Sequence, residues 1–159
     1  MRVVVLGGAA ALAIAAGGGA WWWLSAPRPA EIAVSPVAVD IARGQSLYGA
    51  NCSSCHGANL EGQPDWRSPG ADGLLPAPPH DETGHTWHHT DSMLFSYVKL
   101  GGKELLKRQG MEFDSGMPEF GSTLADQDIW DILAFIKSTW PEREQKTQAD
   151  RTRQELDNG

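Results

Sequence analysis

Apolar residues recur at steps of three and four in two segments of the chain. The first segment follows Asp40 and places these residues on one helical face: Ile41, Gly44, Leu47, Tyr48 and Cys52. The second precedes Pro141 and has the same spacing at Ile129, Ile132, Leu133, Ile136 and Trp140. Aspartate is a favourable N-cap, and proline cannot continue a helix. The pattern therefore predicts two long helices, one near each end of a single domain.

A third helix is expected between these two. Asp91 can cap a helix over residues 92–100, and Gly101-Gly102 would end it. No segment shows the alternation typical of a strand, so the predicted fold class is all-α. Residues 57–90 are rich in glycine, proline and aspartate and are expected to form a loop. A loop of this length is uncommon in a small domain unless it is functional or wraps a bound group.

The N-terminal segment is apolar and uncharged from Val3 to Leu24. In helical form it would span about 30 Å, the thickness of the hydrocarbon core of a bilayer. Three tryptophans, Trp21 to Trp23, would lie at the membrane interface. We expect a membrane anchor, and the alternative is an export signal cleaved after Ala20. Either interpretation places the following domain outside the cytoplasm.

These boundaries divide the chain into four parts. Residues 1–24 form the anchor or signal segment, and residues 25–39 form a proline-rich linker. The domain proper covers residues 40–141 and has room for one core. Residues 142–159 form a polar tail, expected to be a frayed helical extension or disordered.

The chain is acidic, with a formal net charge of −7. This charge excludes nucleic acid as a partner on electrostatic grounds. One basic cluster stands out, formed by Lys99, Lys103, Lys107 and Arg108. It would either orient the protein toward a partner protein or be an ordinary solvated stretch.

Cys52, Cys55 and His56 form the motif C-x-x-C-H, which is the attachment signature of c-type haem. In this chemistry the two thiols bond to the porphyrin vinyl groups, and the histidine becomes an iron ligand. The chain has only two cysteines, so a four-thiolate zinc site is impossible. No alternating strand and helix pattern surrounds the motif, which argues against a thioredoxin-like redox pair. We therefore expect one covalent haem c.

From about Asp40 to Trp140, the chain resembles the class I monohaem cytochromes c, in a membrane-anchored bacterial form. The resemblance rests on Gly44, Tyr48 and Cys52 in the first helix, on Ile132 and Phe135 in the last, and on the motif Gly116-Met117-Pro118. It implies that the N- and C-terminal helices cross and that loops wrap the haem. Ala125 occupies a position where the family usually has a threonine or serine cap, and Thr123 is the expected substitute.

The resemblance also implies site residues. Met117 would be the second axial ligand, and a proline carbonyl, assigned to Pro78, would accept a hydrogen bond from His56. Met93 and Met111 are competing methionines, and a histidine ligand or an open sixth position remains an alternative. His80, His85, His88 and His89 are either loop side chains or ligands of a second metal ion. Trp66 and Trp87 are candidates for shielding the haem from water.

The expected function is one-electron transfer by a non-enzymatic carrier that has redox proteins as partners. The expected location is the bacterial inner membrane, with a single span and the haem domain in the periplasm. Two alternatives remain open: a cytochrome subunit of a dehydrogenase or terminal oxidase complex, and a metal-handling protein that uses the histidine-rich loop.

Overall fold

The computed structural model describes residues 38–112 and 114–158 of the chain. Over these residues the fold is all-helical and contains no strand, as the sequence predicts. The elements in chain order are α2 (Ile41–Asn51), α3 (Ser53–His56), the 3-10 helix η1 (Thr86–His88), α4 (Asp91–Leu100), α5 (Gly102–Arg108), α6 (Asp126–Ser138) and α7 (Glu142–Asn158). The predicted anchor, residues 1–24, and the linker up to residue 37 lie outside the described residues. Within the described part, none of the helices combines the length and the apolar character that a membrane span requires.

Helix α2 begins where the sequence predicts. The Asp40 side chain accepts a hydrogen bond from the backbone N–H of Arg43 at 2.9 Å, which satisfies one of the free donors of the first turn. Gly44 and Tyr48 are buried, whereas Ile41 is 48% exposed. The buried face of α2 therefore starts one turn later than the apolar pattern predicts, and the start of the helix contacts α6 through polar groups: the Asp40 backbone N–H donates to the Asp131 carboxylate at 2.9 Å.

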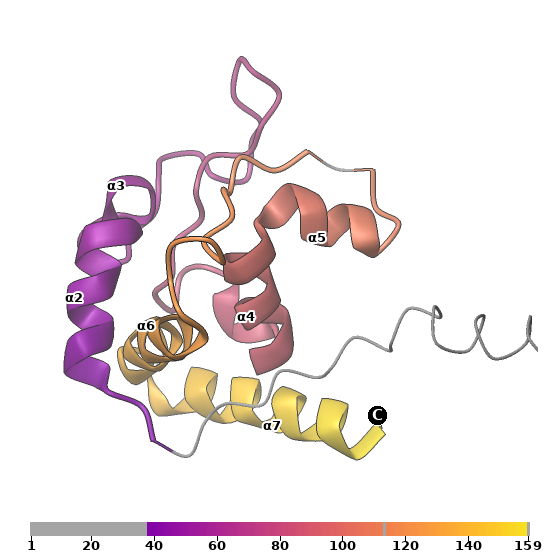
Figure 1. Ribbon diagram of the computed structural model, residues 1–159. Coiled ribbons are helices and arrows are strands. Elements are labelled where there is room, and N and C mark those ends of the chain that lie inside the picture. The colour runs from indigo at the N-terminus through magenta and orange to yellow at the C-terminus, as the bar shows by residue number, and fades with distance from the viewer. Residues whose placement is uncertain (1–37, 113, 159) are drawn as a thin grey trace, which may run out of the picture. The chain divides into compact units, whose positions relative to one another are not determined.

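The central contact of the fold is the crossing of α2 and α6. Figure 1 shows α2 running up the left-hand side of the view while α6 is seen nearly end-on, so the two helices cross steeply. A Cβ atom at Gly44 would lie 1.9 Å from the backbone oxygen of Asp131, so only glycine allows this approach. Tyr48 and Phe135 pack together beside the crossing, with ring centroids 5.5 Å apart. The predicted face of α6 is buried at Ile129, Ile132, Leu133 and Ile136, and Trp140 is buried just beyond its end.

The cap of α6 differs from the expected one. Ala125 occupies the N-cap position, and the Asp128 carboxylate accepts a hydrogen bond from its backbone N–H at 3.1 Å. Thr123 does not cap the helix, because its hydroxyl donates to the Phe120 carbonyl at 3.2 Å. The Asp128 carboxylate in the first turn of α6 therefore satisfies the backbone N–H of the N-cap residue, Ala125. The prediction that Thr123 caps the helix was wrong.

Helices α4 and α5 also correct the sequence analysis. Thr90, not Asp91, is the N-cap of α4, and its hydroxyl accepts from the backbone N–H of Met93. Gly101 ends α4 as expected, but the chain then forms α5, which was not predicted. Leu105 and Leu106 are 7% exposed, and their burial explains why this short segment is helical.

The C-terminal tail is the helix α7, so the helical alternative for residues 142–158 is the one observed. Its contact with the rest of the domain is polar. Gln148 is fully buried and donates to the Asp91 carboxylate at 2.7 Å, and the Thr152 hydroxyl accepts from the Asp91 backbone N–H at 3.0 Å. Lys137 of α6 also donates to Asp91 at 2.7 Å. Asp91 therefore joins α4, α6 and α7, a role that its sequence position does not reveal.

Candidate haem site

The cysteine motif lies where α2 gives way to α3. Cys52 is both the C-cap of α2 and the N-cap of α3, and its backbone N–H donates to the Tyr48 carbonyl at 2.9 Å. The backbone N–H of His56 in turn donates to the Cys52 carbonyl at 2.9 Å. One turn of backbone therefore carries both thiols and the imidazole. Cys55 is exposed, Cys52 is half-buried, and His56 is 6% exposed.

His56 is oriented by the long loop. Its Nδ1 lies 2.8 Å from the Pro78 carbonyl oxygen, which can only accept, so Nδ1 carries the proton and donates it. The other nitrogen, Nε2, is then the one with a free lone pair. Burial lowers the pKa of His56, and the Pro78 carbonyl opposes this effect. The neutral imidazole is the form that binds iron, and the geometry agrees with the role expected of Pro78.

The loop that presents Pro78 is fixed at several points. Backbone N–H groups of Gly62, Gln63 and His80 donate across it, to the carbonyls of His56, Ala77 and Leu60 respectively. Trp140, just beyond the end of α6, donates through Nε1 to the His80 carbonyl at 2.7 Å. Residues far apart in the sequence thus hold the hydrogen-bond acceptor of His56 in place.

The predicted second ligand, Met117, lies on a loop that is tied to the junction of α4 and α5. The Met117 carbonyl accepts from the backbone N–H of Gly102 at 3.0 Å. Its own N–H donates to the Ser115 hydroxyl at 3.3 Å, and that hydroxyl lies 3.1 Å from the Tyr97 hydroxyl. Gly101 has a φ of +76° and packs against this loop, where any Cβ would lie 2.8 Å from the Glu119 nitrogen. The backbone around Met117 is therefore well defined.

The competing methionines have different surroundings. Met111 is 45% exposed. The sulfur of Met93 accepts a hydrogen bond from the Gln109 amide at 3.3 Å. Met117 is half-buried. The assignment of Met117 as the ligand stays a prediction, and these environments favour it over the other two.

The four loop histidines are not gathered into a metal site. His85 stacks on Trp66 at 5.3 Å between ring centroids, and His88 stacks on Trp87 at 3.7 Å. Nowhere among residues 38–112 and 114–158 do three histidine, cysteine or carboxylate side chains come together as metal ligands would. The two loop tryptophans thus pack against histidines, and the structure offers no support for metal handling.

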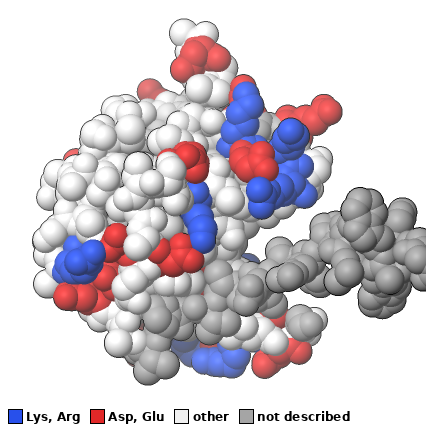
Figure 2. Space-filling view, in the orientation of Figure 1, with Lys and Arg blue, Asp and Glu red and all other residues white. Residues whose placement is uncertain are grey.

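The basic cluster is accompanied by carboxylates. Lys99 pairs with Asp126 at 2.7 Å, and Lys103 pairs with Asp114 at 3.1 Å. Arg108 pairs with Glu104 at 2.8 Å. Figure 2 shows red and blue side chains interleaved on this side of the molecule. This arrangement favours an ordinary solvated stretch over a strongly positive face.

Sequence reasoning missed one neighbour of the site. The His80 ring stacks on the His56 ring, with centroids 4.0 Å apart and planes 19° apart. The only signal in the sequence is that His80 comes two residues after Pro78. That signal gives no direction for the side chain.

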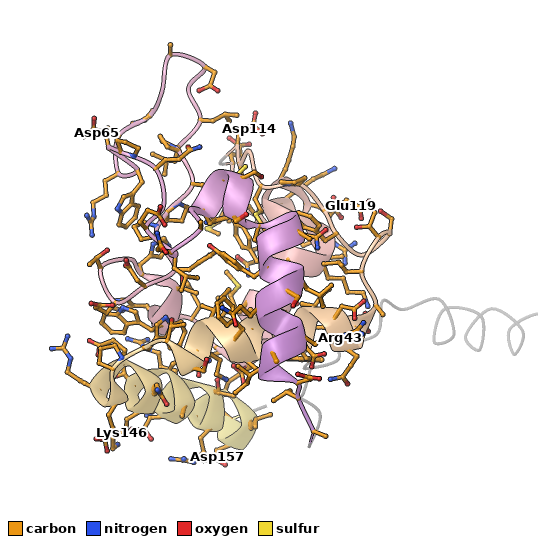
Figure 3. The ribbon with its side chains drawn as sticks, turned by 90° about the vertical axis from the view of Figure 1, so that its left-hand side faces the viewer. Arg43, Asp65, Asp114, Glu119, Lys146 and Asp157 are labelled. Carbon is orange, nitrogen blue, oxygen red and sulfur yellow. The ribbon has the colours of Figure 1, made fainter. Side chains whose placement is uncertain are left out.

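The donor set fits covalent haem c. Two thiols on one turn and a neutral imidazole with a free Nε2 are the groups that this cofactor requires. Side chains in this region are seen in Figure 3, which looks onto α2 and α3 and labels Arg43 near the start of α2.

Comparison with known proteins agrees with this site. The profile of the family described as Cytochrome c matches residues 41–140. Cytochrome c-555 of Prosthecochloris aestuarii is 32% identical over 76 residues, which cover 44% of this chain and 77% of that protein. Cytochrome c-554(547) of Halothiobacillus neapolitanus is 29% identical over 99 residues, covering 61% of this chain and 93% of that protein.

Cytochrome c6 of Gracilaria tenuistipitata var. liui is also 29% identical over 99 residues, covering 62% of this chain and 72% of that protein. No solved structure matches the chain significantly. The family profile spans most of the domain, including the C-x-x-C-H motif and both crossing helices. The chain therefore belongs to the cytochrome c family, carries a covalently bound haem c and is an electron carrier.

Proposed function

We propose that this cytochrome c shuttles single electrons through an iron held between His56 and Met117, and that it does so while tethered to the periplasmic face of a bacterial inner membrane. The observation that carries the assignment of His56 as a ligand is the hydrogen bond from its Nδ1 to the Pro78 carbonyl, at 2.8 Å. It leaves Nε2 available to iron and increases the basicity of the ring. Haem c supplies an iron that alternates between the ferric and ferrous states.

The remaining roles belong to side chains of this chain. Cys52 and Cys55 hold the porphyrin covalently, and the Met117 thioether favours ferrous iron. Hydrogen bonds from Gly102 and to Ser115 hold the backbone of the Met117 loop, which would present the thioether to a bound haem. A ligand set that stays fixed in both oxidation states suits a carrier whose partners are redox proteins.

Replacing Met117 tests the ligand assignment. Met117→Ala should abolish the far-red charge-transfer band of methionine-ligated ferric haem, lower the reduction potential and let carbon monoxide bind the ferrous protein. Met111→Ala is the matched control, because Met111 is an exposed methionine. Met111→Ala should leave the far-red band and the reduction potential unchanged. A Met117→Ala protein with an unaltered band would show that another group is the ligand.

The tether is supported by the uncharged segment from Val3 to Leu24, which is long enough to span a bilayer. The full-length chain should therefore fractionate with membranes, whereas a chain truncated to begin at Ala30 should remain in the soluble fraction. Sequencing the N-terminus of the purified protein is the second measurement. A mature protein that begins directly after Ala20 in the soluble fraction would refute the tether and support a cleaved signal.

A further inference from the structure

His80 differs from the other histidines of its loop in what it contacts. His85 and His88 stack on tryptophans, whereas the His80 ring lies face to face with the ring of His56. The centroid separation of 4.0 Å is close to van der Waals contact between flat rings. His80 therefore contacts the haem ligand itself.

The backbone of His80 is held from two sides. Its N–H donates to the Leu60 carbonyl at 2.8 Å, and its carbonyl accepts from Trp140 Nε1 at 2.7 Å. Leu60 and Trp140 belong to the buried core, 6% and 3% exposed. The core of the domain thus sets the distance between the His80 backbone and His56.

The ring of His80 is held by Thr86. His80 Nδ1 lies 2.9 Å from the Thr86 hydroxyl oxygen, and Thr86 is 6% exposed. The Thr86 hydroxyl donates to the Pro79 carbonyl at 3.4 Å, so toward His80 it acts as an acceptor. His80 Nδ1 therefore donates to Thr86, and this bond fixes the rotation of the His80 ring.

The hydrogen bond to Pro78 does not by itself fix the plane of the His56 ring. It sets the direction of one N–H, but the ring plane turns about the Cβ–Cγ bond, and small turns that keep Nδ1 within hydrogen-bond distance of the carbonyl oxygen remain possible. The terminal torsion of a histidine side chain has broad minima, so little intrinsic energy resists this turning. A second flat ring packed against the face of His56 removes that freedom.

We propose that His80 is a positioning residue for the axial ligand: held by Thr86, it packs against His56 and fixes the plane of that imidazole. The inference rests on the proposed ligation by His56. It also makes His80 unsuitable as the sixth ligand, because a ring stacked on His56 cannot approach the iron from the opposite side. The plane of the axial imidazole determines how unpaired spin is distributed over the porphyrin of the ferric protein, and this distribution is measurable.

The test uses the hyperfine-shifted haem methyl resonances in the proton NMR spectrum of the ferric holoprotein. His80→Leu keeps apolar bulk but removes the flat ring, and Thr86→Val removes only the hydroxyl that holds it. Both variants should change the spread and order of the methyl resonances. Thr86→Ser keeps the hydroxyl and should restore the wild-type pattern. His88→Ala is the control, since His88 stacks on Trp87 and not on His56.

The outcomes separate this inference from the ligation on which it rests. A wild-type spectrum without a low-spin imidazole-ligated ferric haem would overturn both. An imidazole-ligated wild type whose methyl pattern is unchanged in Thr86→Val and His80→Leu would overturn only the positioning role. If His80→Leu does not accumulate as holoprotein, Thr86→Val and Thr86→Ser decide alone. The proposal is supported if the haem methyl pattern changes in Thr86→Val and stays as in the wild type in Thr86→Ser.

Discussion

Gly44 gives the sharpest test of the helix crossing on which the site is built. In Gly44→Ala the new Cβ would lie 1.9 Å from the Asp131 backbone oxygen and 2.4 Å from its carbonyl carbon. Carbon–oxygen contacts in proteins are closest at about 3.3 Å, so the two backbones would have to move apart by about 1.4 Å at this point. Both contacting groups belong to helix backbones, so no side chain can rotate away to relieve the clash.

The expected change in unfolding free energy for Gly44→Ala follows from two opposing contributions. Alanine is favoured over glycine inside a helix by about 0.5–1 kcal/mol. Forcing packed elements apart costs about 1–3 kcal/mol, and more where backbone must move. Tyr48, Ile129 and Ile132 are at most 2% exposed beside this crossing, so separation of α2 and α6 disturbs the best-buried part of the core. We expect Gly44→Ala to destabilise the protein.

Gly49→Ala isolates the steric term. Gly49 lies in the same helix, and a Cβ there meets no atom within 4 Å. This variant should gain the propensity term alone and be slightly more stable than the wild type. The difference in unfolding free energy between the two alanine variants is then the cost of the clash, about 1–3 kcal/mol or more. Guanidinium unfolding of the holoproteins, followed by far-UV circular dichroism, measures it. Equal stability of the two variants would refute the close crossing.

Two further predictions concern polar contacts between elements. Gln148→Leu removes the amide that donates to Asp91 and should cost about 1–3 kcal/mol; hydrogen exchange should rise in α7, while the exposed control Gln154→Leu leaves it unchanged. Unaltered exchange would mean that α7 is held in another way. The Arg43 guanidinium lowers the pKa of Asp128. The pair therefore stabilises the fold above the unfolded pKa of about 3.9, and this contribution is lost as the pH falls through the lower folded value. Asp128→Asn should be less stable than the wild type near neutral pH, and denaturant midpoints should converge in acid. A stability gap that does not narrow in acid would show that the charge of Asp128 is not its source.

Helices α2 and α6 could be predicted because their sequence signals are local. Asp40 caps α2, and the apolar face of α6 from Ile129 to Ile136 is buried as its spacing indicates. Local signals also misled where another element intervenes. Thr90 caps α4 instead of Asp91, since Asp91 is engaged by Lys137 and Gln148. Helix α5 was missed because the preceding pair of glycines indicates an end and not a new start.

The candidate site divides in the same way. Cys52, Cys55 and His56 are neighbours in the chain, so their chemistry could be predicted from spacing alone. The contact of His56 with Pro78 joins residues 22 positions apart, and a family resemblance was needed to suggest it. The stacking of His80 on His56 had no sequence signal, because it depends on how the long loop closes against Leu60 and Trp140.

The sequence by itself thus determined the covalent chemistry, the two long helices and the acidic character of the chain, since each of these is carried by residues close together or by composition. Tertiary structure decided which loop groups surround His56, that His85 and His88 stack on tryptophans while His80 stacks on His56, and that the polar tail folds onto Asp91. These features rest on hydrogen bonds and ring contacts between distant segments. Their geometry exists only once the core around Tyr48 and Ile132 has fixed the positions of the segments.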